Sequence, residues 1–110
     1  MIVRLQGKTR EERHAVTSAA SDAIVAAGGY VLDYNQFSNL AVNFTLELPP
    51  AGFARLRQAL GEIGVILPPP SAEELAAAAG QTGREIPGSL RIDFEHKEPD
   101  LRIPIPAVPG

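Results

Sequence analysis

Cysteine and tryptophan are both missing from this sequence, and aromatic residues make up only 5% of it. Without cysteine, the chain can form no disulfide bond, carry out no thiol catalysis and hold no cysteine-ligated metal. Hydrophobic residues still account for 45% of the 110 residues, so we expect one modest core built mainly from aliphatic side chains and alanine.

Basic blocks and long apolar runs are missing as well. The 10 basic residues are outnumbered by 13 acidic ones, and they form no stripe of the kind that binds a phosphate backbone. No apolar run approaches the roughly 18–20 residues of a membrane span, and the first residues do not form a secretory signal. We therefore expect a cytoplasmic protein that binds neither nucleic acid nor membranes.

Proline is missing from the first 48 residues, whereas all 10 prolines lie from residue 49 onward. This change in composition divides the chain into two parts. Residues 1–67 are predicted to form one domain of regular elements with short connections. Residues 68–110 are predicted to form an extension of short elements and proline-rich links, packed on the same domain or on a partner subunit.

The first part reads as six elements in the order β-α-β-β-α-β. Strands are predicted at residues 1–6, 30–36, 40–48 and 65–67, and two apolar stripes at helical spacing predict helices between them. Thr9 and Glu12 fit a capping box at the start of the first helix, and Pro49-Pro50 opens the second. This order predicts an α+β fold of the ferredoxin-like kind, an antiparallel four-stranded sheet with both helices on one face.

The extension reads as a spacer, a short helix, a strand and a tail. Residues 68–70 predict a stiff extended spacer, and Ser71 with Glu74 fits a second capping box for an alanine-rich helix that ends at Gly80. Alternation of apolar and polar residues over 90–95 predicts a fifth strand. The proline-rich tail, residues 100–110, is predicted to be an edge-like or polyproline II segment or to be disordered.

The polar pattern of the hairpin between residues 30 and 48 predicts its register. A three-residue loop of Phe37, Ser38 and Asn39, with Gln36 paired to Leu40, keeps the apolar side chains on one face. In this register Asp33, Asn35, Asn43 and Thr45 share the face away from the helices. Phe37 is then at the tip, where it folds back on the sheet, contacts a second subunit or stacks on a ligand.

The segment Val31-Leu32-Asp33-Tyr34-Asn35-Gln36 resembles the second strand of ACT-like domains, through Leu32, Asp33 and Gln36. These domains are ferredoxin-like modules that sense small molecules and usually work in pairs. Their amino-acid ligands commonly lie near the loop after the first strand, at the interface between two domains. The resemblance thus implies a ligand site at Gly7, Lys8 and Thr9, with Asp33 and Gln36 as further candidates.

Other candidate sites have simpler explanations. Gly7, Lys8 and Thr9 would form an anion site at a helix N-terminus, but they also fit a turn, a solvated cation and a cap. Asp93, Glu95 and His96 do not predict a metal site, because neighbouring strand residues point to opposite faces. The serines lack a His-Asp context, so we expect no catalytic residues and no cofactor.

These patterns together predict a non-enzymatic, small-molecule-binding or regulatory module that acts as a homodimer. Its ligand would be a small polar molecule such as an amino acid, and Phe37 would lie at the subunit interface. The alternative is a structural protein-protein interaction module without a ligand, which uses its sheet edges and its proline-rich tail to bind a protein partner.

Overall fold

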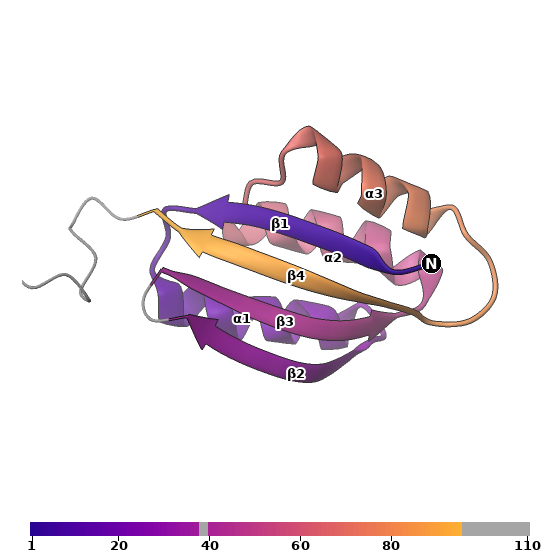
Figure 1. The fold of residues 1–110 in the computed structure, drawn as a ribbon, viewed down its shortest axis with the longest axis horizontal. Coiled ribbons are helices and arrows are strands. Elements are labelled where there is room, and N and C mark those ends of the chain that lie inside the picture. The colour runs from indigo at the N-terminus through magenta and orange to yellow at the C-terminus, as the bar shows by residue number, and fades with distance from the viewer. Residues whose placement is uncertain (38–39, 96–110) are drawn as a thin grey trace, which may run out of the picture.

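Four strands form one mixed sheet in the computed structural model, which describes residues 1–37 and 40–95. The strands are β1 (Val3–Thr9), β2 (Tyr30–Phe37), β3 (Ala41–Leu48) and β4 (Ile86–Phe94), and they lie side by side in the order β1-β4-β3-β2 (Figure 1). Every second residue of β1 and β4 is buried, as their alternating sequences require. The predicted α+β class is confirmed.

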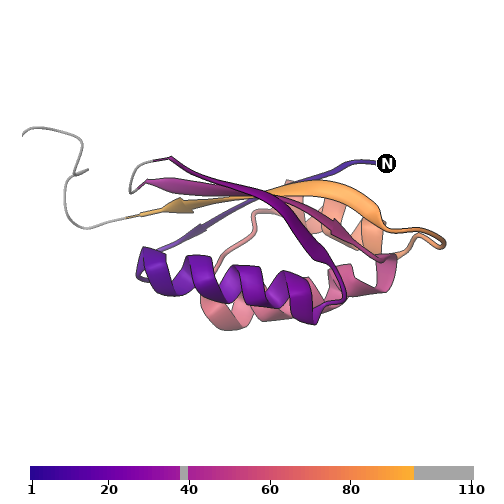
Figure 2. The ribbon, with the colours of Figure 1, turned by 90° about the horizontal axis from the view of Figure 1, so that it is seen from below.

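Three helices cover the sheet. α1 (Arg13–Ala26) and α2 (Pro50–Ile63) lie on one face of it (Figure 2), and α3 (Pro69–Ala79) packs against α2 and β1. Alanines in the buried stripe of α1 let that helix approach the sheet closely. The largest fully buried side chains come from both layers: Phe44, Phe53, Ile24, Leu46, Leu48, Leu56, Leu60, Leu75, Leu90, Ile92, Val3 and Val16.

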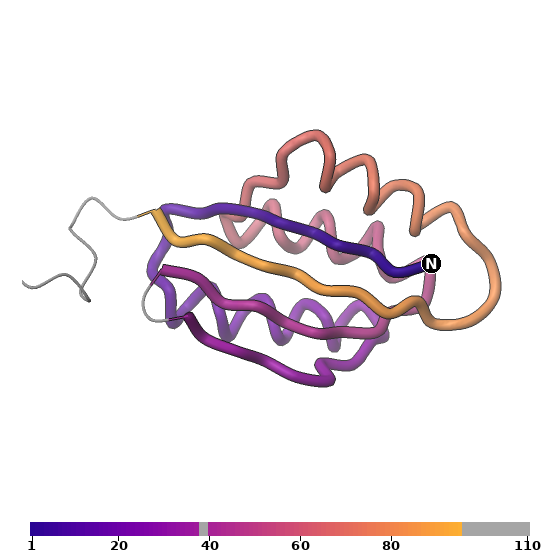
Figure 3. Tube along the Cα trace, viewed as in Figure 1, coloured from indigo at the N-terminus to yellow at the C-terminus, as the bar shows by residue number. Residues whose placement is uncertain are grey.

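The order β-α-β-β-α of the first five elements is confirmed and is consistent with a ferredoxin-like type of fold. The prediction of a purely antiparallel sheet is wrong, because β1 and β4 are parallel. The cause is α3, which adds one more reversal after α2 (Figure 3). The chain therefore enters β4 in the direction of β1, and β4 lies between β1 and β3, antiparallel to β3.

The predicted strands at 65–67 and 90–95 take other roles. Ile66 makes only an isolated antiparallel bridge with Lys8, through backbone bonds of 3.0 and 2.8 Å. The prolines that follow have no N–H to extend such a ladder. The segment predicted as a fifth strand is part of β4, an inner strand, and residues 1–37 and 40–95 contain no fifth strand.

The predicted hairpin register is also wrong. Gln36 pairs with Val42 rather than with Leu40, and Phe37 pairs with Ala41 as the last residue of β2. From Asp33 to Gln36 the two registers differ by two residues, so over this stretch they place the same side chains on the same faces. The predicted polar row is therefore present: Asp33 lies opposite Thr45, and Asn35 lies opposite Asn43.

Strand β2 contains an irregularity that the sequence did not reveal. The register shifts by one residue between Val31 and Asp33, so Leu32 is left out of the regular pairing. As a result Val31 lies opposite the buried Leu46 on the helix side, whereas Tyr30 lies opposite Glu47 on the open side. Tyr30 is therefore on the opposite face of the sheet from Tyr34, although regular alternation would place both on one face.

The first predicted capping box is not formed. Thr9 ends β1, and the N-cap of α1 is Glu12, whose carboxylate accepts hydrogen bonds from the amides of His14 (2.8 Å) and Ala15 (3.0 Å). The His14 amide, and then the Ala15 amide, lower the pKa of the Glu12 carboxyl below its usual value. Helix α1 consequently begins at Arg13, four residues beyond the predicted cap.

Residues of the predicted extension contribute to the same core as the first part. Leu75 and Ala78 of α3 and Leu90 and Ile92 of β4 belong to one cluster with the buried residues of the other elements. The proline-rich tail and the residues Ser38, Asn39 and His96 lie outside the described residues. Within residues 1–37 and 40–95, no helix is long and apolar enough to cross a membrane.

Candidate functional site

Gly7, Lys8 and Thr9 lie inside strand β1, not at a helix N-terminus as expected. A Cβ on Gly7 would lie 2.6 Å from Cγ1 of Val65, so close packing explains why this residue is glycine. The Thr9 hydroxyl is buried; it donates to the carbonyl of Gly64 (2.8 Å) and accepts from the Glu11 amide. These contacts hold the structure together and leave the Lys8 side chain as the exposed group of the three.

Asp33 and Gln36 belong to β2, at the opposite edge of the sheet from β1. β4 and β3 separate β2 from β1, a distance of about 14 Å at the usual strand spacing. Asp33 is on the open face, where it faces Thr45, whereas Gln36 faces Val42 on the helix side and accepts a hydrogen bond from the Tyr34 hydroxyl (3.2 Å). Within one chain the five predicted ligand residues therefore do not form one site.

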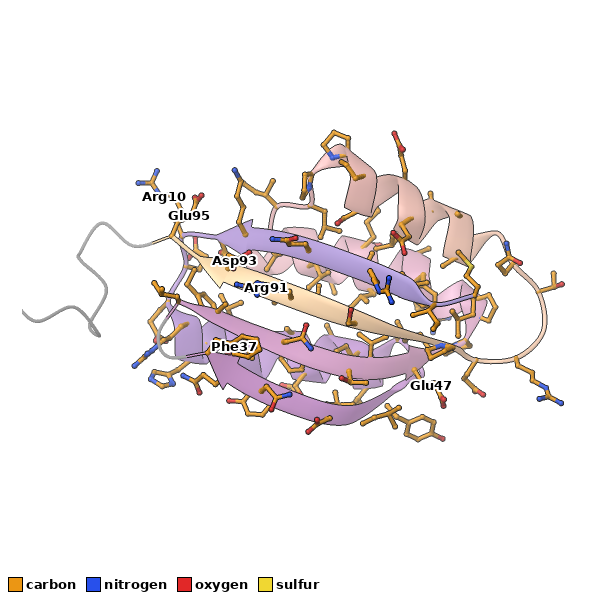
Figure 4. The ribbon with its side chains drawn as sticks, viewed as in Figure 1. Arg10, Phe37, Glu47, Arg91, Asp93 and Glu95 are labelled. Atoms are coloured by element: carbon orange, nitrogen blue, oxygen red, sulfur yellow. The ribbon has the colours of Figure 1, made fainter. Side chains whose placement is uncertain are left out.

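Phe37 lies over the open face at the end of β2. The Arg91 guanidinium is 5.5 Å from the centroid of the Phe37 ring (Figure 4). This cation–π contact joins β2 to β4 across the intervening strand β3. Ala41, opposite Phe37, is buried although it belongs to the open face. The ring thus folds back on the sheet, as one of the three interpretations expected, and it remains 48% exposed.

The charged groups at the centre of the open face pair with one another. Arg91 donates to Asp93 (3.0 Å), and the other oxygen of Asp93 accepts from the Gln6 amide side chain (3.1 Å). Lys8 lies 3.9 Å from Glu95 at the end of the same strands. Exposed pairs of this kind contribute little to stability, but in each of them one positive charge balances one negative charge.

The outer edge of β1 is closed by the chain itself. The amide of Arg4 donates to the Glu74 carboxylate (2.6 Å), that of Gln6 to the Ser71 hydroxyl (2.9 Å), and that of Lys8 to the Ile66 carbonyl. Ser71 and Glu74 therefore do not form the predicted capping box. Proline at 69 and 70 removes the first amides that a cap would serve, and both side chains are used on the sheet edge instead.

The outer edge of β2 is different. Every residue of β2 except Val31 is exposed, although the strand is rich in large side chains. Four of the eight exposed large hydrophobic side chains of the described residues are in this strand: Tyr30, Leu32, Tyr34 and Phe37. Within residues 1–37 and 40–95 no further strand pairs with β2 on its outer side. An exposed apolar edge of this kind favours pairing with another chain.

A cleft of about 380 Å³ lies on the helix side of the same strand, between α1 and β2. The helix wall carries Thr17, Ser18, Ser21 and Asp22, and the sheet wall carries Val31, Tyr34 and Phe44. The rings of Tyr34 and Phe44 have centroids 5.7 Å apart and are tilted by 43°, so they form one aromatic surface. The cleft thus combines three hydroxyl groups, one carboxylate, a phenol and an apolar wall.

Sequence reasoning missed this cleft because its polar residues look like an ordinary solvated helix face. The lining residues include Ser18 and Ser21 but no histidine or lysine that could activate them as nucleophiles. A metal site is not formed by groups of acidic or histidine residues in the described part of the chain. The side chains of the cleft offer hydrogen bonds, one negative charge and apolar contact to a bound molecule.

Comparisons of the chain with protein-family models, with curated proteins and with solved structures gave no match. The ACT-like resemblance therefore depends on Leu32, Asp33 and Gln36 and on the order of the elements.

Proposed function

We propose that this chain is a non-enzymatic, small-molecule-binding regulatory module of the ACT-like, ferredoxin-like type, and that it acts as a homodimer joined through the outer edges of two β2 strands. The observation that carries the proposal is the contrast between the two sheet edges. One is closed by three hydrogen bonds from the chain itself, whereas the other has no partner strand among the described residues and carries four exposed large hydrophobic side chains.

Pairing of two β2 edges would extend each four-stranded sheet into a continuous sheet of two subunits. β2 has a single charged residue, Asp33, and no proline or lysine that would oppose such pairing. Phe37 would lie next to the interface rather than at its centre, because its ring is held over the open face by Arg91. The irregularity at Leu32 would set the position at which the two strands meet.

A regulatory role is supported by the place of the cleft. Since the cleft is lined in part by β2, a molecule bound there would contact the same strand that forms the proposed interface. Ligand binding and association would then be coupled, because a ligand that binds one association state better shifts the equilibrium towards it. Neither Asp22 nor the hydroxyl groups need a second subunit in order to reach the ligand.

Light scattering during size-exclusion chromatography tests the dimer with two matched variants. Leu32 and Ile66 are both aliphatic and similarly exposed, at 56% and 60%, but Leu32 is on β2 and Ile66 is beside β1. We expect a mass of twice 11.7 kDa for the wild type and for Ile66→Lys, and a monomer for Leu32→Lys, because lysine blocks edge pairing. A monomeric wild type at high concentration contradicts the proposal.

The ligand-free alternative, a structural interaction module, is tested by a thermal-shift panel of amino acids and other small polar metabolites. A ligand that raises the melting temperature supports sensing. A panel without any such ligand, together with an intact dimer, favours the interaction module.

A further inference from the structure

We infer that the cleft between α1 and β2 is the ligand site, and that it takes a small organic cation with a protonated amine and an apolar body. This inference deepens the proposed ligand-binding function and rests on it. The ligand would lie with its ammonium group towards Asp22 on the helix and with its apolar part against Tyr34 and Phe44 on the sheet.

The charge of the cleft is the first reason. Asp22 is the only ionisable acid or base among its lining residues apart from the Tyr34 phenol, and it forms no ion pair with any residue of 1–37 and 40–95. It lies in the second half of α1, and the last turn of that helix has no basic residue. No basic group of the last turn therefore offsets the charge of Asp22, and this carboxylate favours a cation in the cleft.

The hydrogen-bonding groups point to an amine rather than to a metal ion. Thr17, Ser18 and Ser21 supply hydroxyl oxygens that accept hydrogen bonds from an ammonium group with three N–H donors. A divalent cation would need several charged or carbonyl oxygens at short distance, and the lining side chains include one carboxylate.

The sheet wall and the size of the cleft define the rest of the ligand. Phe44 is buried and Tyr34 is half-exposed, so the aromatic surface has one edge in the core and one at the opening. The faces of these rings attract cations as well as apolar groups. A volume of about 380 Å³ is at the small end of ligand pockets, which suits a molecule of the size of an aromatic amine.

Titrations followed by amide NMR shifts test the inference with three matched probes. Phenethylamine has the charge and the ring, phenethyl alcohol has a neutral hydroxyl in place of the amine, and 3-phenylpropionate has the opposite charge. We expect phenethylamine to shift the amides of residues 17–22 and of β2, and to bind about tenfold more tightly than the alcohol, the usual effect of a charge-assisted hydrogen bond. The carboxylate should bind more weakly still.

Three variants locate the site. Asp22→Asn should weaken phenethylamine binding about tenfold and leave the affinity for the alcohol unchanged. Asp33→Asn, on the open face, and Lys8→Ala, on β1, should leave both affinities unchanged. Equal affinity for amine and alcohol, or an Asp22→Asn variant that binds the amine as the wild type does, would overturn the inference.

The outcomes separate this inference from the function on which it rests. Loss of ligand binding in Lys8→Ala, with shifts around Gly7 to Thr9, would retain a ligand-binding module and reject the cleft. Binding in the cleft by a protein that light scattering shows to be monomeric would retain the cleft and reject the homodimer.

Discussion

Removal of the Ser71 hydroxyl tests the closed edge of β1 at a single hydrogen bond. In Ser71→Ala the amide of Gln6 loses its acceptor at 2.9 Å, and Ser71 itself is only 6% exposed. An amide left without a partner costs about 1–3 kcal/mol, and about 1.5 kcal/mol, in the lower half of this range, applies here because Gln6 is on an edge that water can enter. Alanine regains about 0.5 kcal/mol of helix propensity, so we expect a net loss of about 1 kcal/mol.

Guanidinium denaturation and thermal unfolding measure this loss, which corresponds to a fall in melting temperature of about 4–8 °C for a domain of this size. Ser18→Ala is the matched control, because it makes the same change on an exposed helix position without a hydrogen bond to the sheet. Hydrogen exchange at the Gln6 amide should accelerate only in Ser71→Ala. Equal stability of the two variants, with unchanged Gln6 exchange, would refute the claim that this side chain closes the edge.

Three further experiments test the Phe37–Arg91 contact, the Glu12 cap and the packing around two glycines. A double-mutant cycle of Phe37→Leu and Arg91→Met should give a coupling of about 0.5–1 kcal/mol in denaturation experiments, and no coupling would mean that the ring does not interact with the guanidinium. Glu12→Gln should lose most stability at neutral pH. The lowered pKa of Glu12 stabilises the fold fully above pH 4.5, so the gap between variant and wild type should close as the pH falls further. Gly88→Ala would bring its Cβ to 2.6 Å from the Val3 carbonyl and should cost about 1–3 kcal/mol, whereas Gly61→Ala, with open space around it, should stabilise the protein by up to about 1 kcal/mol.

Local patterns predicted the elements well, because each is set by residues close in sequence. The alternation of Leu40 to Leu48 and the apolar stripe from Val16 to Ala27 gave β3 and α1 with small errors at their ends. The same patterns predicted the wrong neighbours for β4. Alternation shows that one face of a strand is buried, but it does not show which strands lie beside it, and the reversal by α3 decided that point.

The hairpin register, the second capping box and the cleft were also beyond what local patterns can predict. The polar pattern of the hairpin cannot distinguish registers that differ by two residues, because both place Asp33 and Asn35 on the same face. The capping box at Ser71 and Glu74 was a sound local motif, yet both side chains bond to β1, 65 and 70 residues away in sequence. The cleft was not predicted, because its two walls come from α1 and β2 and neither wall is distinctive alone.

NMR contacts between chains show which sheet edges meet in the proposed dimer. In a sample that mixes ¹³C-labelled and unlabelled chains, isotope-filtered NOEs arise only between subunits. We expect such NOEs between the side chains of Leu32 and Tyr34 and those of β2 in the second chain, and we expect them to be lost in Leu32→Lys. Intermolecular NOEs from the α3 side of β1, or a dimer whose β2 side chains show none, would exclude the pairing of two β2 edges.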